Sequence, residues 1–390
     1  MITFWVITMF VLGITVGSFL TAVIYRLNAA NWPSPTKPLS LLEPQRSMCP
    51  NCKHALGPFD LMPLFSFLIF GQKCRYCKKP ISWRYFGVEL LTGLTFVAIY
   101  LKFPHDVSTL TAMLVFAAVL IPIFFIDFET FTIPISLTLL ATVIAVTRDA
   151  WGIAHSEAGF ELLWGWLPRS LMGWLIGTLI FGAVRIAGWL YKGVEAMGLG
   201  DVFLARAMGT MFMVVMPANL TPAHLAYWSF PLWVILSCVS GILVFPMFVV
   251  VRRQGQQKDS TKLNDLGNNS KKTRDKYGNL LTDVETTVGD PEEFVKTVFL
   301  GLAWGTEFAY QLMEVGQVLV CYDAYEWARF TFDRKYRAEC AAKEAALPPE
   351  EVWIPDPTAI PFGPFLVVGF LLTLFFGKAI IIAYLAYAHL

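Results

Sequence analysis

The sequence has few charged residues. Asp, Glu, Lys and Arg make up 15% of its 390 residues, against about 25% in a soluble domain. Hydrophobic residues make up 56%, and the mean hydropathy is +0.57. This composition excludes a soluble globular enzyme, a disordered chain and a nucleic-acid-binding protein. The net charge of +1 suggests no charged partner, and seven Cys are too few and too unevenly spaced for a secreted disulfide scaffold.

Two common hydrolase motifs are also missing. The five His residues are scattered along the chain and none belongs to an HExxH sequence, which zinc proteases use to hold their metal. No GxSxG sequence is present either, so the chain lacks the nucleophile elbow of many serine hydrolases. Any hydrolytic chemistry must therefore come from other residues.

Apolar residues gather in long runs. Eight segments come near the roughly 20 residues that cross a bilayer as a helix: 1–25, 85–101, 107–126, 130–147, 170–191, 202–218, 225–251 and 358–388. The first lacks the basic start and small-residue cleavage site of a signal peptide, so we interpret it as a true span. The sequence predicts an all-α polytopic membrane protein with about eight transmembrane helices.

The loop 27–84 is rich in Lys and Arg, which predicts that it is cytoplasmic and that the N-terminus lies outside. Alternation then places Asp127, Asp201 and the segment 252–357 at the cytoplasmic face. Residues 254–291 are predicted to be a flexible linker and 292–345 a helical part of a cytoplasmic insertion. The expected organisation is a first transmembrane helix, a cytoplasmic zinc-binding loop, a six-helix membrane core, the insertion and a last transmembrane helix, at 1–26, 27–84, 85–251, 252–357 and 358–390.

Four cysteines form two CxxC pairs, Cys49–Cys52 and Cys74–Cys77, with 21 residues between them. Each pair offers two sulfurs from one tight turn, which suits a tetrahedral zinc ion. A reducing cytoplasm disfavours disulfides between them. Because all four ligands are Cys, no coordination position stays open and the metal is expected to be structural. The alternative is a set of unligated or redox cysteines.

Ionisable residues at membrane depth are costly and therefore indicate function. Asp201 follows Gly198-Leu199-Gly200, where two glycines let the backbone approach another helix or an extended peptide. Asp127 is expected at the same face of the bilayer and is the best second carboxylate. One ionised and one protonated aspartate could activate water and polarise a peptide carbonyl. Glu129, by contrast, is expected to be an ordinary acid at a helix end in interfacial water.

These features resemble the type IV prepilin peptidases, bifunctional leader peptidase/N-methyltransferases of the GxGD aspartic protease class. The resemblance covers about 250 residues. It rests on the two CxxC pairs, on Ile126-Asp127 with Ile133-Pro134, on the GxGD sequence, and on five further stretches: Gly17–Leu27, Leu61–Ser66, Pro80–Tyr85, Val88–Gly93 and Ala359–Phe365.

The resemblance implies a bacterial inner-membrane enzyme with Asp127 and Asp201 as catalytic residues. Its substrates would be prepilins or pseudopilins, cut at the cytoplasmic boundary and then methylated from S-adenosylmethionine, with membrane lipids as the other partners. Methylation would involve the Cys loop and the helix from Glu89 to Gly93. Residues expected to support the site or the substrate are Gly198, Gly200, Glu89, Glu129 and Pro134.

The chain departs from the family pattern at two positions near the aspartates. Ile135 stands where an aspartate is usual, and Phe203 stands where a lysine is common. The insertion 252–357 has no counterpart that we could match. Two other functions therefore stay open: an inactive relative that acts as an assembly scaffold, and a zinc-regulated transporter. The oligomeric state is not predicted by the sequence.

Overall fold

The computed structural model describes residues 2–31, 47–157 except 50 and 53, 160, 167–192, 197–215, 230–243 and 361–387. The predicted insertion 252–357 lies outside the described residues. The described part is helical and contains no strand, only two isolated bridges, Met48 with Ala55 and Lys73 with Pro80. The prediction of an all-α protein is therefore confirmed for the described residues.

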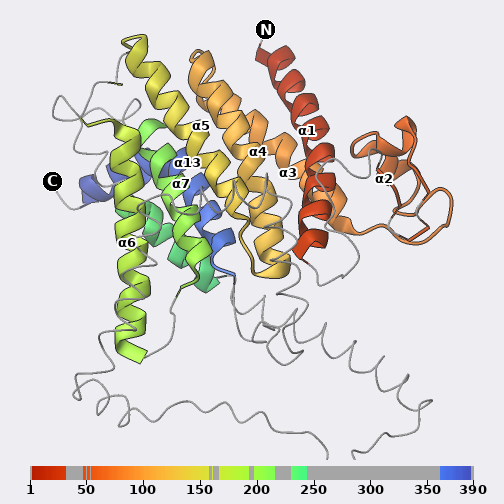
Figure 1. The fold of residues 1–390 in the computed structure, drawn as a ribbon. Coiled ribbons are helices and arrows are strands. Elements are labelled where there is room, and N and C mark those ends of the chain that lie inside the picture. Colours follow the sequence, from red (N-terminus) through yellow and green to blue (C-terminus); the bar gives the residue numbers. More distant parts are fainter. Residues whose placement is uncertain are drawn as a thin grey trace, which may run out of the picture.

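Figure 1 shows long helices lying side by side, with a small lobe beside α1 at one edge and α6 near the opposite edge. The lobe consists of residues 47–82 and contains the short helices η1 (Pro58–Leu61) and α2 (Phe65–Ile69). The long helices are α1 (Ile2–Asn31), α3 (Trp83–Lys102), α4 (Val107–Thr130), α5 (Ile135–Ala154), α6 (Arg169–Lys192), α7 (Leu199–Val215) and α13 (Gly363–Tyr387).

Six of these helices are long and apolar enough to span a membrane: Ile2–Leu27, Trp83–Lys102, Val107–Thr130, Ile135–Ala154, Arg169–Gly188 and Gly363–Tyr384. They coincide with six of the eight predicted spans. The other two predictions correspond to α7, which has 17 residues, and to the apolar helix Phe230–Leu243. The protein is a multi-pass membrane protein.

Helix boundaries follow local chemistry. Ser82 caps α3 by accepting a hydrogen bond from the Arg84 amide at 3.3 Å, and Asp106 caps α4 through the Thr109 amide at 2.9 Å. Such caps satisfy amides that the first turn leaves free. At its other end α4 stops because Phe131 takes a left-handed conformation with φ of 57°.

Small residues bring pairs of helices together. In α1 and α3, a Cβ at Gly13 would lie 2.7 Å from the Cα of Gly93, so these backbones touch. In α6 and α7, a Cβ at Gly173 would collide with the carbonyl of Gly209. Close backbone approach of this kind is typical of helix pairs within membranes.

Helix α7 lies at the centre of the bundle. It packs against α5, α6 and α13, and every residue from Val202 to Val215 is buried. Beside it Trp233 is fully buried and makes ring contacts with Phe212 and Phe370. A helix that is buried on all sides is a firm platform for residues at its end.

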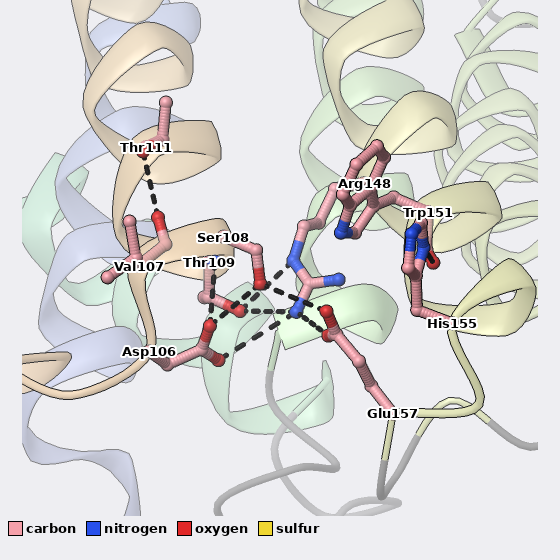
Figure 2. Close-up of polar contacts among 9 residues, drawn as sticks. All are labelled: Asp106, Val107, Ser108, Thr109, Thr111, Arg148, Trp151, His155 and Glu157. Carbon is pink, nitrogen blue, oxygen red and sulfur yellow. Dashed lines mark hydrogen bonds and ion pairs between the residues drawn. The ribbon is translucent and has the colours of Figure 1, made fainter.

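A buried ion cluster joins α4 and α5 (Figure 2). It lies at the start of α4, whereas Asp127 lies near the end of this helix. Arg148 of α5 is 3% exposed. Its Nη2 lies 2.6 Å from Glu157 Oε2 and donates to Thr109 Oγ1 at 2.8 Å. Asp106 lies 3.8 Å away, and the guanidinium rests over the Phe160 ring at 4.1 Å. A charge this deeply buried is tolerated because it is paired and hydrogen-bonded.

Candidate active site and metal centre

Two aspartates from different helices meet at one end of the bundle. Asp127 lies in the last turn of α4 and is 3% exposed. Asp201 lies in the first turn of α7 and is partly exposed. The two carboxylates interact electrostatically. The structure thus brings together the two residues that the sequence singled out as a pair.

The first residue of α13, Gly363, lies beside the two aspartates. The backbone of Gly363 faces the carboxylates of both Asp127 and Asp201. A Cβ at Gly363 would collide with Asp127 Oδ2, so only glycine allows this approach. Gly363 belongs to a stretch that supports the family resemblance, but no sequence pattern predicts that it lies at the site. Its position depends on a contact between residues more than 150 positions apart.

The segment between α4 and α5 covers the GxGD turn. After Phe131 reverses the chain, Ile133 packs onto both glycine positions. A Cβ at Gly200 would lie 3.0 Å from Ile133 Cβ, and one at Gly363 would lie 3.1 Å from Ile133 Cδ1. Pro134 follows as the N-cap residue of α5. The predicted role of Gly200 in close backbone approach therefore has a definite neighbour, the Ile133 side chain.

Among the described residues, one buried oxygen of each carboxylate has no hydrogen-bond partner, namely Asp127 Oδ2 and Asp201 Oδ1. Burying an acceptor without a partner costs free energy, so each such oxygen needs an explanation, and a catalytic role is one. The Gly198 backbone also faces the Asp201 carboxylate, and the Asp201 amide donates to the Gly198 carbonyl at 3.2 Å. The first glycine of the motif thus shapes the turn that carries the acid.

Two other predicted residues lie apart from this pair. Glu129 forms an ion pair with Arg84, whose Nη1 lies 2.9 and 2.6 Å from its two carboxylate oxygens, so it joins α4 to the start of α3. Glu89 is 9% exposed and accepts a hydrogen bond from the Leu64 amide at 2.7 Å. Glu89 therefore links α3 to the Cys-containing lobe.

The helix from Glu89 to Gly93 faces α1. A Cβ at Gly93 would lie 2.7 Å from Ile14 Cγ2 and 2.9 Å from Phe10 Cε2. Among the described residues, this stretch is taken up by helix packing and by the contact with Leu64. The contacts of the described residues therefore do not test the expected role of Glu89–Gly93 in methylation.

Arg185 supports the GxGD turn from α6. It is 2% exposed, and its Nη1 donates to the Met197 carbonyl at 2.8 Å, directly before Gly198. In the sequence, Arg185 stands out only as an ionisable residue within a predicted span, 170–191. That signal could point to a polar partner within the protein, but it could not identify a backbone carbonyl.

The four predicted metal ligands come together in the lobe. The sulfur atoms of Cys49, Cys52, Cys74 and Cys77 all lie within 4.8 Å of one another, and those of Cys49 and Cys77 are 4.0 Å apart. Tetrahedral zinc with bonds of about 2.3 Å needs sulfurs about 3.8 Å apart. The donor set fits a zinc ion, and its four thiolates leave no position for substrate.

The thiols differ in their ease of ionisation. Burial raises the pKa of Cys49, but backbone hydrogen bonds from Cys52 and Asn51 outweigh it and lower this pKa to about 7. A backbone hydrogen bond from His54 lowers the pKa of Cys52, but partial burial and the sulfurs of Cys49 and Cys77 raise it to about 11. Thiols that oppose each other's ionisation in this way are stabilised together by a cation.

The fold and the site define a class: a multi-pass helical membrane protein with two facing aspartates and a lobe whose four cysteines could hold a metal ion. Residues 11–103 match the family model described as Bacterial Peptidase A24 N-terminal domain, and residues 114–245 match that of the Type IV leader peptidase family. The chain belongs to the type IV leader peptidase family.

Curated relatives carry names that agree with this family. The Prepilin leader peptidase/N-methyltransferase of Aeromonas hydrophila is 31% identical over 267 residues, which cover 64% of this chain and 83% of the relative. That of Myxococcus xanthus is 36% identical over 201 residues, covering 52% and 54%, so the match spans about half of that relative. That of Pseudomonas aeruginosa is 31% identical over 224 residues, covering 53% and 72%. No solved structure matches the chain.

Proposed function

We propose that this protein is a membrane-embedded aspartyl endopeptidase that removes the leader peptide of type IV prepilins or pseudopilins. The observation that carries the proposal is the meeting of Asp127 and Asp201 beside the Gly363 backbone. The names of the relatives, which are prepilin leader peptidases, supply the substrate class.

The chemistry follows from two carboxylates that share one proton. The ionised aspartate takes a proton from a water molecule while the oxygen of that water attacks the scissile carbonyl carbon. The protonated aspartate donates its proton to the carbonyl oxygen. When the carbon–nitrogen bond breaks, the leaving nitrogen takes a proton from the first carboxyl group. The pair then titrates as a unit, and either aspartate can hold the shared proton at rest.

The reaction site belongs at the cytoplasmic face of the bacterial inner membrane in this proposal. The excess of Lys and Arg in the loop 27–84 supports a cytoplasmic position for this loop and an N-terminus on the outside. Asp127 and Asp201 then lie where a transmembrane substrate helix emerges into the cytoplasm. An apolar substrate helix can stay in the bilayer while its leader reaches the aspartates.

A second proposed activity is methylation of the new amino terminus with S-adenosylmethionine as methyl donor. It is supported by the N-methyltransferase part of the relatives' names. The chain would orient the free amine beside the donor, and the methyl group would pass from sulfonium sulfur to nitrogen with loss of a proton.

The test is co-expression of the full chain with a prepilin-like substrate, followed by mass spectrometry of the product. The wild-type chain is expected to remove the leader and to add the mass of one methyl group. Asp127→Asn and Asp201→Asn are expected to leave the substrate uncut while each chain still accumulates in the membrane.

Asp106→Asn is the matched control, because it is the same substitution at the N-cap of α4, at the end of that helix away from the pair. Cleavage by either of the two active-site variants would overturn the aspartyl mechanism. An uncut substrate with the wild-type chain, across several prepilin sequences, would favour the scaffold alternative. Leader removal without added methyl mass would refute the second activity only.

A further inference from the structure

The lobe exposes large apolar side chains on its short helices. In α2, Phe65, Leu68 and Ile69 are 56%, 64% and 71% exposed. Their i, i+3, i+4 spacing places them on one face of the helix, while Phe67 points to the opposite side and is buried. In η1, which packs against α2, Phe59 is 73% exposed. A protein surface in contact with water rarely carries an apolar patch of this kind unless a protein partner or a membrane covers it.

Contacts with α3 fix the height of this patch relative to the membrane. Phe67 packs against Trp83 and Phe86, with ring centroids 5.0 and 5.3 Å apart. Trp83 is the first residue of a membrane span and is 62% exposed, as is common for tryptophan at a membrane interface.

A deeper contact comes from Glu89, which accepts the Leu64 amide at 2.7 Å. Residue 89 is six positions beyond residue 83, or about 9 Å along the helix axis. Since α2 begins at the next residue, Phe65, and its Phe67 packs on Trp83 and Phe86, this helix lies between the first turn of the span and the level of Glu89. That depth corresponds to the boundary between headgroups and acyl chains, which begins about 5–8 Å from the bilayer surface.

The charged side chains that are exposed on the described part of the lobe are positive. Lys73, Lys78 and Lys79 are exposed and lie in the turn that follows α2. Asp60 is the only acid between residues 47 and 82. Its side chain is 6% exposed, and it accepts hydrogen bonds from the Gly57 amide and the Tyr76 hydroxyl at 3.0 and 3.1 Å. The surface beside the apolar face is therefore cationic.

We propose that α2 and η1 lie in the headgroup region of the bilayer that the chain spans, with Phe59, Phe65, Leu68 and Ile69 inserted among the lipids. Lys73, Lys78 and Lys79 then pair with anionic headgroups. The lobe is thus a membrane-inserted element, and the metal centre is held at the bilayer surface. An amphipathic element with apolar insertion and basic flanks is the usual means of such binding. This lipid contact does not depend on the peptidase activity.

The test uses the full chain in lipid nanodiscs, with the photoreactive residue p-benzoylphenylalanine at Phe65 or at Leu68. Phe19, a 65% exposed residue of the α1 span, carries the same residue as a positive control. After irradiation, mass spectrometry is expected to find lipid adducts at 65 and 68 as it does at 19. Protein cross-links in place of lipid adducts, or labelling at 19 alone, would overturn the proposal.

A charge variant tests the headgroup contacts separately. Lys73→Gln, Lys78→Gln and Lys79→Gln are combined in the chain that carries the photoreactive residue at 65. In phosphatidylglycerol nanodiscs the lipid adduct at 65 is expected to fall, by up to roughly fivefold per lysine. In phosphatidylcholine nanodiscs it is expected to stay constant. An equal yield for both chains in phosphatidylglycerol would contradict the lysine contacts.

Discussion

At the scale of single residues, the absence of a side chain at Gly363 matters as much as the acids beside it. Gly363→Ala adds a methyl group that would collide with Asp127 Oδ2 and lie 3.1 Å from Ile133 Cδ1. The aspartates must then shift apart. A displacement of about 1 Å in a catalytic group can slow a reaction about 100-fold, and we expect a loss of this size in the rate of leader cleavage.

Gly87→Ala is the control for that measurement, because a Cβ at Gly87 meets no atom within 4 Å. Both variants should insert to the wild-type level, as judged by the amount of chain in purified membranes. Wild-type cleavage by Gly363→Ala would mean that the pair tolerates a side chain at this position, and that the close approach of α13 is incidental.

The residues that could be predicted from the sequence carry their signal locally. Asp201 is marked by the glycines before it, and the Cys pairs are marked by their spacing. Asp127 could be chosen as the partner because charge patterning placed it at the same membrane face. Gly363 and the contact between Arg185 and Met197 could not be found this way. They depend on how α13 and α6 pack, and no local pattern encodes that packing.

At the scale of secondary-structure elements, the buried cluster around Arg148 joins α4 to the C-terminal end of α5. Arg148→Met keeps much of the side-chain volume but removes the hydrogen bonds to Thr109 and Glu157. Hydrogen bonds to charged groups contribute about 1.5–3 kcal/mol each, and Glu157 is partly exposed, so water can replace its partner. We expect a loss of about 2 kcal/mol in the free energy of unfolding.

Thermal unfolding of the purified protein in detergent, followed by circular dichroism, measures this change. Thr147→Ala serves as the neighbouring control, because Thr147 is exposed and bonds only the Val143 carbonyl of its own helix among the described contacts. The cleavage rate of the folded Arg148→Met protein should stay near that of the wild type, since the cluster is at the far end of α4. An unchanged unfolding midpoint would show that the cluster contributes little to stability.

The helices that could be predicted from the sequence are those that long apolar runs mark. The apolar runs gave the long helices, because a bilayer span needs about 20 uncharged residues. Their ends differ by several residues from the predictions. For example, α5 extends to Ala154 although the predicted span stopped before Arg148. A charged residue usually ends a span, but the cluster with Glu157 allows Arg148 to stay inside the helix bundle.

At the scale of the whole molecule, the lobe and the helix bundle are stabilised by different means. The bundle has a large core built around α7, with residues such as Leu204, Met208 and Phe212 almost fully buried. Among the described residues of the lobe, the buried hydrophobic side chains are Cys49, Phe67 and Cys74. So small a core cannot stabilise an independent unit, and a structural metal can take its place.

The metal should therefore hold the lobe without being needed for the helices. The purified wild-type protein is expected to carry about one zinc ion per chain, measured by inductively coupled plasma mass spectrometry. Cys74→Ser should lose it, because one thiolate of four is gone, whereas Cys238→Ser should keep it, since Cys238 is a free cysteine outside the cluster.

In hydrogen exchange, Cys74→Ser should lose protection at residues 47–82 and keep it along α7. Loss of protection in both regions would mean that the lobe and the bundle unfold together, because the contacts of Glu89 with Leu64 and of Phe67 with Trp83 couple them. Full zinc content in Cys74→Ser would refute the four-cysteine site itself.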